Sequence, residues 1–238
     1  MNHVVESLAR VALLAFVCFI FWLAADTILS SVANLCVIVL GVLLTFPVVW
    51  LGRKVLDRHQ TIRYAVWTTT WVHVAMGLTL GVPVVRALTT HRDWPRWALP
   101  VPSGIGLAMV IVTGAACLLV VVNLALKGIG APGIALSRKL ASDWFYAWTR
   151  NPMALAAFAL FVSLGIWFQS ALFVLWVLIL FAPAVLFFIR VYEERELEIR
   201  FGEAYRLYRA STPFLWPSLR PHTPPNEPMQ LPGRTLLL

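Results

Sequence analysis

Long apolar runs limit what this chain can fold into more than any other feature. Six segments are rich in apolar residues and poor in charge, at residues 9–29, 32–51, 64–88, 104–126, 153–168 and 171–191. A helix needs roughly 20 apolar residues to cross the hydrocarbon core of a bilayer, and the fifth segment is short for a full span. Because 60% of the 238 residues are hydrophobic and 13% are charged, most of the chain cannot be soluble surface. We therefore expect an all-α fold, a polytopic membrane helical bundle of five to six transmembrane helices.

The order of these segments predicts a single membrane domain over residues 1–217, with N-terminal transmembrane helices at 9–100 and a C-terminal core at 104–217. Pro152 can occupy the first turn of a helix, where its missing N–H is not needed. The two apolar runs after it are separated by little more than the sequence FQS, which predicts a C-terminal helical hairpin. The chain is rich in proline after residue 212, so we expect a strap followed by a disordered tail at 218–238.

The net charge of +8 is better explained by membrane topology than by a nucleic-acid partner. Orientation follows the excess of Lys and Arg in cytoplasmic loops. With the N-terminus inside, the cytoplasmic side collects most basic residues, and the opposite side keeps chiefly Arg86, Arg92 and Arg96. We expect an integral protein of a bacterial inner membrane, in contact with membrane lipids, with both termini in the cytoplasm. The oligomeric state is left open.

Few polar residues lie inside the apolar runs, and we expect structural roles for them. Asn34 lies near a tight hairpin where water is close, and His73 should be a hydrogen-bonded packing residue. Cys18, Cys36 and Cys117 are scattered, which predicts neither a disulfide framework nor a metal site. We expect these cysteines to be small buried apolar residues.

The segment YEERE, residues 192–196, directly follows the last apolar run, where basic residues are usual on the cytoplasmic side. A hairpin returns the chain to the membrane face that it left. Arg150 and Asn151, before the hairpin, should therefore lie beside Glu193 and Glu194, after it. The two carboxylates would then face a basic, polar loop.

A cytosolic amphipathic helix is predicted beyond these carboxylates. Leu197, Phe201, Tyr205 and Tyr208 recur at spacings of four, four and three, which places them on one helix face. Charged residues occupy the other faces, with Glu196 four residues before Arg200 for a favourable ion pair. We expect this helix to continue the last membrane helix.

The membrane face at which the hairpin begins and ends would hold an arginine, two glutamates and several aromatic rings. These groups suit a ligand that is zwitterionic and also carries a further positive charge. Carboxylates accept hydrogen bonds from an ammonium or from ribose hydroxyls, and arginine forks onto a carboxylate. Aromatic faces attract a cation. S-adenosyl-L-methionine has all of these parts, but the residue types alone do not single it out. A solvated charged helix start remains the alternative, as does an interfacial anchor for residues 127–152.

The order of these motifs carries a family resemblance. RNPM, an apolar hairpin and then EERELEIRFGEAYRLY resemble the isoprenylcysteine carboxyl methyltransferase and phospholipid methyltransferase superfamily of integral membrane enzymes. The pattern covers about residues 127–217 and is met by Tyr146, Arg150, Asn151, Pro152, Glu193, Glu194, Leu197, Phe201, Gly202, Tyr205, Tyr208 and Pro213. The resemblance implies an S-adenosylmethionine-dependent methyltransferase. Its acceptor would be lipidic or small and hydrophobic, such as an isoprenylcysteine carboxylate or a phospholipid amine.

The resemblance also implies roles for single residues. The cofactor contacts would be Arg138, Lys139, Leu140, Ala141, Tyr146, Asn151, Pro152, Met153 and Glu193. Arg150 would lie near the acceptor or the cofactor carboxylate. Glu194 would orient its neighbour or Arg150, or would deprotonate an amine acceptor. We therefore take Arg150 and Glu194 as the candidate catalytic residues.

Several positions depart from the family pattern, among them Ala131, which stands where the family has threonine. Trp144 replaces a glycine, Ala154 stands where many members have tyrosine, and Phe214 replaces an arginine. A non-catalytic membrane protein that keeps this architecture for assembly or lipid binding is therefore a second hypothesis. A small transporter is a third, although its polar residues would line a central path rather than gather at one surface.

Overall fold

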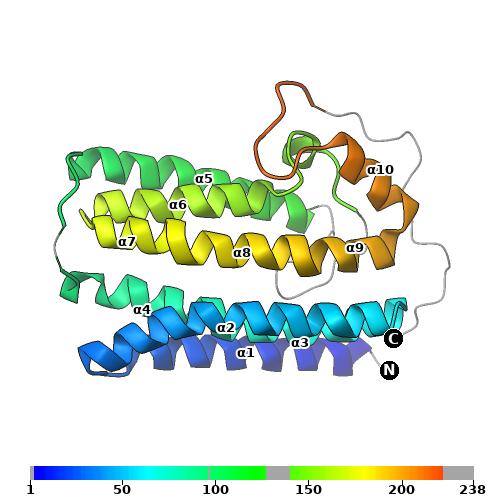
Figure 1. Cartoon of the computed structure of the whole chain (residues 1–238), viewed down its shortest axis with the longest axis horizontal. Coiled ribbons are helices and arrows are strands. Elements are labelled where there is room, and N and C mark those ends of the chain that lie inside the picture. Colours follow the sequence, from blue (N-terminus) through cyan, green and yellow to red (C-terminus); the bar gives the residue numbers. More distant parts are fainter. Residues whose placement is uncertain (1–2, 96, 127–139, 222–238) are drawn as a thin grey trace.

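The structure, a computed structural model, describes residues 3–95, 97–126 and 140–221. These residues form helices and no strands. The helices run along the long axis of an elongated bundle (Figure 1). The predicted all-α class and helical-bundle architecture are confirmed.

The N-terminal half forms one layer of the bundle (Figure 1). Its elements are α1 (His3–Asp26), α2 (Ser31–Arg58), α3 (Ile62–Met76), the π-helix η1 (Gly77–Gly81), α4 (Val82–Thr90) and the 3₁₀ turn η2 (His91–Asp93). Ser30 caps α2, because its side chain accepts a hydrogen bond from the backbone N–H of Ala33. Thr61 caps α3 in the same way through Tyr64.

The C-terminal half forms the second layer (Figure 1). It begins with α5 (Ser103–Leu126), the 3₁₀ turn η3 (Trp144–Ala147) and α6 (Pro152–Trp167). One long helix follows, made of α7 (Ala171–Trp176), the π-helix η4 (Val177–Phe181), α8 (Ala182–Phe188), the π-helix η5 (Ile189–Glu193) and α9 (Glu194–Phe201). The chain then turns into α10 (Glu203–Ser211).

The core lies between the layers, where α2 packs against the long C-terminal helix. Ile38, Val42 and Val49 of α2 and Phe173 and Val177 of the long helix are among its fully buried side chains. This contact places the N-terminal half directly against the helix that carries YEERE.

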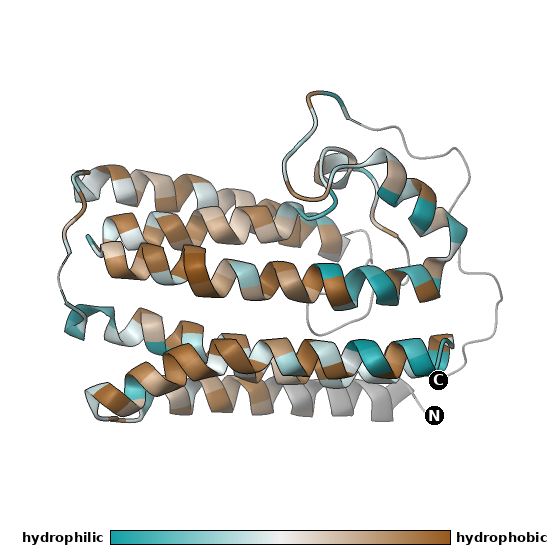
Figure 2. Cartoon of the chain, viewed as in Figure 1, coloured by the Kyte–Doolittle hydropathy of each residue, from teal (hydrophilic) through white to brown (hydrophobic). Residues whose placement is uncertain are grey.

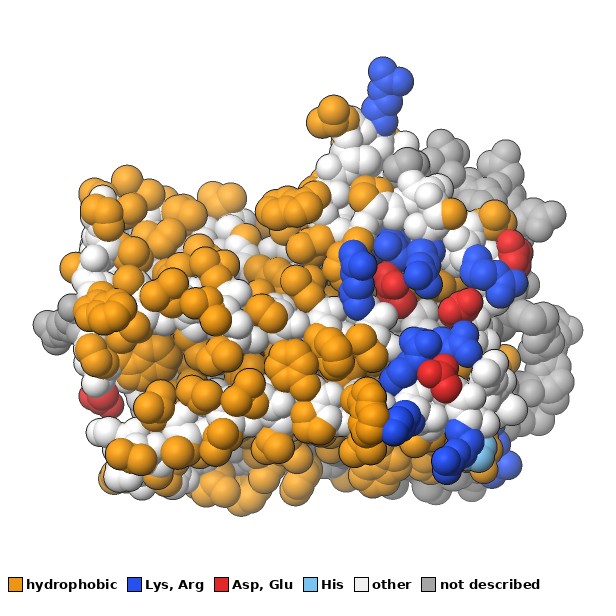
Figure 3. Space-filling model, viewed as in Figure 1, with side chains coloured by type: hydrophobic (Ala, Val, Ile, Leu, Met, Phe, Trp, Pro, Cys, Tyr) orange, Lys and Arg blue, Asp and Glu red, His pale blue; other side chains and the backbone are white. Residues whose placement is uncertain are grey.

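Four helices of the described residues are long and apolar enough to cross a membrane, namely Ser31–Arg58, Ile62–Asp93, Ser103–Leu124 and Ala171–Phe201. Ala15–Asp26 and Pro152–Trp167 are shorter apolar helices. Hydrophobic residues predominate along the helices (Figure 2). Apolar side chains cover most of the visible surface, and most of the visible Lys, Arg, Asp and Glu gather at one end, here called the charged end (Figure 3). The chain is an integral membrane protein. The expectation of buried cysteines is wrong for Cys18 and Cys36, which are exposed on the outer surface of their helices.

A buried arginine organises the opposite end of the bundle. Arg86 is 4% exposed, and its Nε donates to Asn34 Oδ1 at 2.7 Å. Its Nη1 donates to the carbonyls of Ala24 and Thr27, each at 2.7 Å. These carbonyls lie at the C-terminal end of α1, where helix carbonyls lack intrahelical partners and a cation is favoured. Asn34 thus has the structural role expected for it.

The predicted hairpin turns at Gln169, which has a positive φ of 54°. Its side-chain amide donates to the carbonyl of Val101 at 2.7 Å, and the N–H of Ala171 donates to the carbonyl of Trp97 at 2.9 Å. The turn is therefore tied to the segment that precedes α5. The helix after the hairpin returns to the charged end, as the sequence predicts.

The amphipathic helix differs from the expectation at one residue. Gly202 has φ 56° and ψ −127°, a conformation that separates α9 from α10. This backbone region is open essentially to glycine alone. The predicted apolar stripe still forms, because Phe201, Tyr205 and Tyr208 are buried together with Leu197 against Leu140. The chain therefore folds back over the charged end instead of extending from it.

Candidate functional site

The segment after Pro213 crosses the entrance to the hairpin as a strap, defined here as residues 213–218. The N–H of Arg150 donates to the carbonyl of Pro213 at 2.9 Å, and the Asn151 side chain donates to the carbonyl of Phe214 at 2.7 Å. Thr149 Oγ1 donates to the carbonyl of Leu215 at 2.9 Å. The strap therefore fixes the backbone of the RNP motif.

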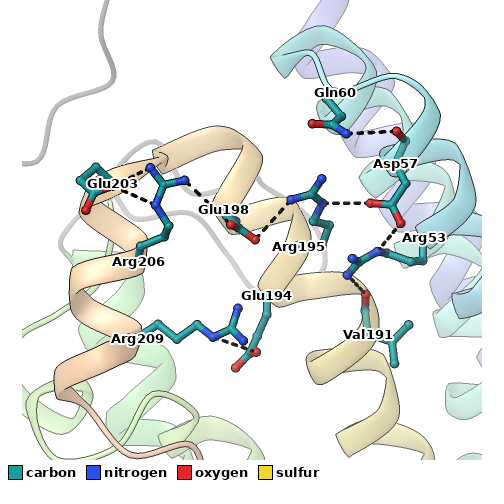
Figure 4. Close-up of polar contacts among 10 residues, drawn as sticks. All are labelled: Arg53, Asp57, Gln60, Val191, Glu194, Arg195, Glu198, Glu203, Arg206 and Arg209. Carbon is teal, nitrogen blue, oxygen red and sulfur yellow. Dashed lines mark hydrogen bonds and ion pairs between the residues drawn. The ribbon is translucent and has the colours of Figure 1, made fainter.

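Arg150 and Glu194 meet across the hairpin, as predicted. Arg150 Nη1 donates to Glu194 Oε1 at 2.6 Å, and the two side chains are 12% and 9% exposed. Arg209 of α10 approaches the other carboxylate oxygen, with Nε 3.7 Å from Glu194 Oε2 (Figure 4). Arg150 Nε is buried without a hydrogen-bond partner. Buried donors are nearly always paired, so this nitrogen is an unused donor at the site.

Tyr146 and Glu193 lie near this pair. Burial raises the pKa of Tyr146, and the negative charge of Glu193 raises it further. Tyr208 donates its hydroxyl to the carbonyl of Tyr146 at 2.8 Å. Glu193 is half-buried and, within the described ranges, accepts no hydrogen bond and joins no ion pair. Its carboxylate is therefore available to a ligand.

The local helix geometry around Glu193 is unusual. The π-helices η1 and η4 each end two residues before a proline, Pro83 and Pro183, and a missing proline N–H explains the displaced hydrogen bonds there. The π-helix η5 has no such proline. Isolated π turns inside α-helices are frequent at functional sites. The widened turn at η5 thus sets the direction in which Glu193 and Glu194 leave the helix.

Tyr192 fixes the rotation of this turn. It is fully buried, and its hydroxyl shares a hydrogen bond of 2.9 Å with Thr69 Oγ1 of α3. Its ring lies against Gly52 of α2, where an added Cβ would be 2.9 Å from the ring. A larger residue at 52 would displace the tyrosine. The contact between Gly52 and Tyr192 was not predicted from the sequence. The one feature that could have indicated it is a glycine within α2, which leaves room for a large side chain from another helix.

His73 has the packing role expected for it. Its Nδ1 lies 2.8 Å from the carbonyl of Thr69, and its ring meets the edge of Phe188.

A chain of charged residues links α2 to α9 beside the site (Figure 4). Arg53 pairs with Asp57 at 2.7 Å and donates to the carbonyl of Val191 at 2.9 Å. Arg195 Nε lies 3.0 Å from Asp57 Oδ1. Sequence analysis also missed this network, since its partners lie 138 residues apart. It ties the end of the N-terminal hairpin to the helix turn that carries Glu194.

The predicted Glu196–Arg200 pair forms at 2.6 Å, but it is not on a solvated face. The two side chains are 4% and 6% exposed. Burial of an ion pair costs desolvation free energy, which good hydrogen-bond geometry must offset. The reading of EERE as an ordinary solvated helix start therefore fails for this part of the motif.

The remaining predicted residues are placed as follows. Pro152 is the first residue of α6 and is buried, with Asn151 before it and Met153 after it. Leu140 packs on the Tyr205 and Tyr208 cluster. Ala141 follows Leu140 and is half-buried, whereas Arg138 and Lys139 lie outside the described residues.

The structure shows the surroundings of three of the residues that depart from the family pattern. Trp144 has a φ of 51°, in the left-handed region that glycine adopts more readily than a residue with a side chain. Phe214 is contacted by two guanidinium groups, because its ring centroid lies 5.6 Å from Arg150 Cζ and 4.1 Å from Arg190 Cζ. Ala154 packs against the main core cluster.

Comparison with known proteins bears on the same region. Residues 103–204 match the family model for phospholipid methyltransferase. Searches of curated proteins and of solved structures gave no match. The matched segment runs from the start of α5 to the first residues of α10, so it includes Arg150, Glu193 and Glu194. The family indicates a membrane methyltransferase in general. This match confirms the resemblance to the phospholipid methyltransferase family that the RNP and EE motifs predict.

Proposed function

We propose that this chain is an S-adenosyl-L-methionine-dependent methyltransferase of the membrane, with its site on the cytoplasmic face at the charged end. It transfers a methyl group to a lipidic or small hydrophobic acceptor. One observation carries the proposal: Arg150 meets Glu194 across the hairpin and keeps a buried, unpaired Nε, while the adjacent Glu193 forms no ion pair within the described residues.

The donor set suits the cofactor. Arg150 offers an N–H to the carboxylate of an amino acid head, and Glu193 offers oxygens to an ammonium or to ribose hydroxyls. Tyr146 and Tyr205 add aromatic surface near a cationic sulfur. Burial and then the charge of Glu194 raise the pKa of Tyr205, so its hydroxyl stays protonated and can donate. Leu140 supplies an apolar wall.

The chemistry that the cofactor supplies is an electrophilic methyl group, which a nucleophile takes directly with no covalent enzyme intermediate. The task of the protein is alignment and exclusion of water. Holding two reactants near attack distance supplies roughly 7–11 kcal/mol of a barrier. Glu194 accepts from Arg150 and faces Arg209, so its role is to hold the guanidinium in place. Glu193, without such a partner, is the better candidate for accepting a proton from an amine.

Equilibrium binding tests this proposal. S-adenosylmethionine is titrated into the detergent-purified full chain and into Glu193→Gln. We expect at least about tenfold weaker binding for the variant, or roughly 1.4 kcal/mol. The matched control is Glu203→Gln, because Glu203 is 67% exposed and pairs only with Arg206 of its own helix. No binding to the folded wild-type protein would favour the non-catalytic alternative.

A further inference from the structure

The strap is held at the level where α6 begins. The backbone N–H of Ser218 donates to the carbonyl of Trp148 at 2.9 Å, and the N–H of Arg150 donates to the carbonyl of Pro213 at the same distance. Trp148 and Arg150 lie just before α6, an apolar helix whose first residue is Pro152. Both ends of the strap are therefore fixed to the backbone at the depth where this helix enters the apolar layer.

The length of α6 places this depth at the membrane boundary. The helix has 16 residues, which at a rise of 1.5 Å per residue make about 24 Å. The hydrocarbon core of a bilayer is roughly 30 Å thick. A helix this short has its ends at or inside the hydrocarbon boundary rather than in water. The strap, which lies beside one of these ends, is therefore close to lipid.

The inner side of the strap is polar, and its polar groups are paired within the protein. The Asn151 side chain donates to the carbonyl of Phe214 at 2.7 Å, and Thr149 Oγ1 donates to the carbonyl of Leu215 at 2.9 Å. Backbone groups near the hydrocarbon need such partners, because water is scarce there. The strap thus spends its carbonyls on the RNP motif and turns other groups outwards.

The outer side of the strap is apolar. Trp216 is 75% exposed, and Leu219, directly after the strap, is 98% exposed. Arg220 follows and is also exposed. The orange loop in Figure 1 leaves the bundle sideways, across its long axis, and Figure 3 shows apolar and basic side chains projecting there. Because the helices cross the membrane along that axis, the loop extends in the plane of the membrane.

We propose that the strap is seated in the membrane interface, with Trp216 and Leu219 inserted between the acyl chains and the headgroups. Tryptophan is enriched at this level of a bilayer. Removing a leucine side chain from water contributes roughly 1.5–3 kcal/mol. Arg220 reaches the headgroups from the same loop, since long basic side chains extend towards the aqueous side of an interface. The partner of this surface is the bilayer that the helices span.

The neighbouring helix surface supports lipid as the occupant. Leu119 and Val122, near the C-terminal end of α5, are exposed on a helix long enough to cross the membrane. The α5 helix packs against α6 and ends at the charged end of the bundle (Figure 1). The apolar edge of the strap therefore continues a surface that already faces lipid.

The seat couples the bilayer to the candidate site. Phe214 of the strap lies 5.6 Å from the guanidinium carbon of Arg150 and 4.1 Å from that of Arg190. Lipid that holds Trp216 and Leu219 also holds this ring over the two arginines. The bilayer thus helps to keep the strap closed on the RNP motif. This inference does not depend on the methyltransferase function and applies equally to a non-catalytic protein.

Spin-label depth measurements test the seat on the full chain in nanodiscs of phosphatidylcholine and phosphatidylglycerol. A nitroxide is attached to Leu219→Cys in a chain whose Cys18, Cys36 and Cys117 are replaced by alanine. Collisions with oxygen, which concentrates in hydrocarbon, and with a water-soluble nickel chelate give the depth of the label. We expect a depth at the boundary between acyl chains and headgroups.

Two further labels set the scale of this measurement. Glu203→Cys gives the limit in water, because Glu203 is exposed on α10. Leu118→Cys gives the limit in hydrocarbon, because Leu118 is exposed on α5. A label at Leu219 as open to the nickel chelate as the label at Glu203 would place the strap in water and overturn the proposal. A label screened from both reagents and broadened by a second label would mean that another copy of the chain covers the strap, which would also overturn it.

Hydrogen exchange tests whether the seat holds the strap closed. In the same nanodiscs, the amide of Arg150 should exchange at least about tenfold faster in the double variant Trp216→Ser and Leu219→Ser, because its hydrogen bond to Pro213 opens more often. Leu207→Ser is the control, since Leu207 is half exposed on α10 and outside the strap. Equal protection in the double variant and the wild type would show that the hydrogen bonds alone hold the strap and would refute the role of the bilayer.

Discussion

Arg86, which is buried, and Arg150, which is half-buried, lie towards opposite ends of the bundle, and their donors are satisfied in different ways. Arg86 places its donors on an amide oxygen and two backbone carbonyls, and none of its buried nitrogens lacks a partner. Arg150 shares one nitrogen with Glu194 and leaves its Nε buried and unpaired. Burial of an arginine thus does not by itself indicate function. An unused buried donor at the same end of the bundle as the unpaired carboxylate of Glu193 is the feature that indicates function.

The two arginines also differ in what surrounds them. Arg86 closes the end of α1 and contacts Asn34 at the start of α2, so its partners belong to the scaffold. Arg150 is surrounded by α9, α10 and the strap, elements joined by turns rather than by long packed helices. We therefore expect substitutions at the Arg86 end to change stability and substitutions at the charged end to change binding.

Arg86→Ala should have the largest effect on stability. It leaves two helix-end carbonyls and the Asn34 oxygen without donors, and hydrogen bonds to charged groups contribute roughly 1.5–3 kcal/mol each. We expect a loss of about 3 kcal/mol, measured by thermal unfolding in detergent. Arg92→Ala, which removes an exposed arginine at the same end, should change stability little. If both variants unfold at the same temperature, the hydrogen bonds of Arg86 do not stabilise this end of the bundle.

Gly202→Ala should have a smaller effect, confined to the charged end. An added Cβ meets no atom within 4 Å, so its cost comes from the backbone conformation alone. That strain is about 1–3 kcal/mol. Gly104→Ala is the matched control, since its Cβ also meets nothing and its φ is ordinary. The strained backbone of Gly202→Ala should displace α10. We expect thermal unfolding to show lower stability, and cofactor titration to show weaker binding, in this variant and not in Gly104→Ala. Unchanged binding would mean that α10 does not contribute to the site.

The sequence predicts the hairpin and the meeting of Arg150 with Glu194 because the length of two apolar runs determines the face to which the chain returns. It misses the break at Gly202 because the apolar stripe of Leu197, Phe201 and Tyr205 continues through it in register. The spacing of apolar residues indicates which face of a helix is buried, but it does not indicate whether the helix axis bends.

Contacts between distant segments were the other part that could not be predicted. Arg86 and Asn34 are 52 residues apart, and Tyr192 and Thr69 are 123 apart. Each pair depends on how two helices cross, which no local pattern encodes. The path of the strap could not be predicted either, because its backbone carbonyls accept the hydrogen bonds from Thr149, Arg150 and Asn151, and a backbone acceptor leaves no pattern in the sequence.

The most direct test of the account is the affinity of S-adenosylmethionine for the purified Arg150→Gln chain, titrated beside the wild type. Arg206→Gln serves as control, because Arg206 is an exposed arginine that pairs with Glu203 and Glu198. We predict at least about tenfold weaker binding for Arg150→Gln, since the unused donor is lost, and no change for the control. Equal affinity of Arg150→Gln and wild type would contradict the account, because Arg150 would then be a second structural arginine like Arg86.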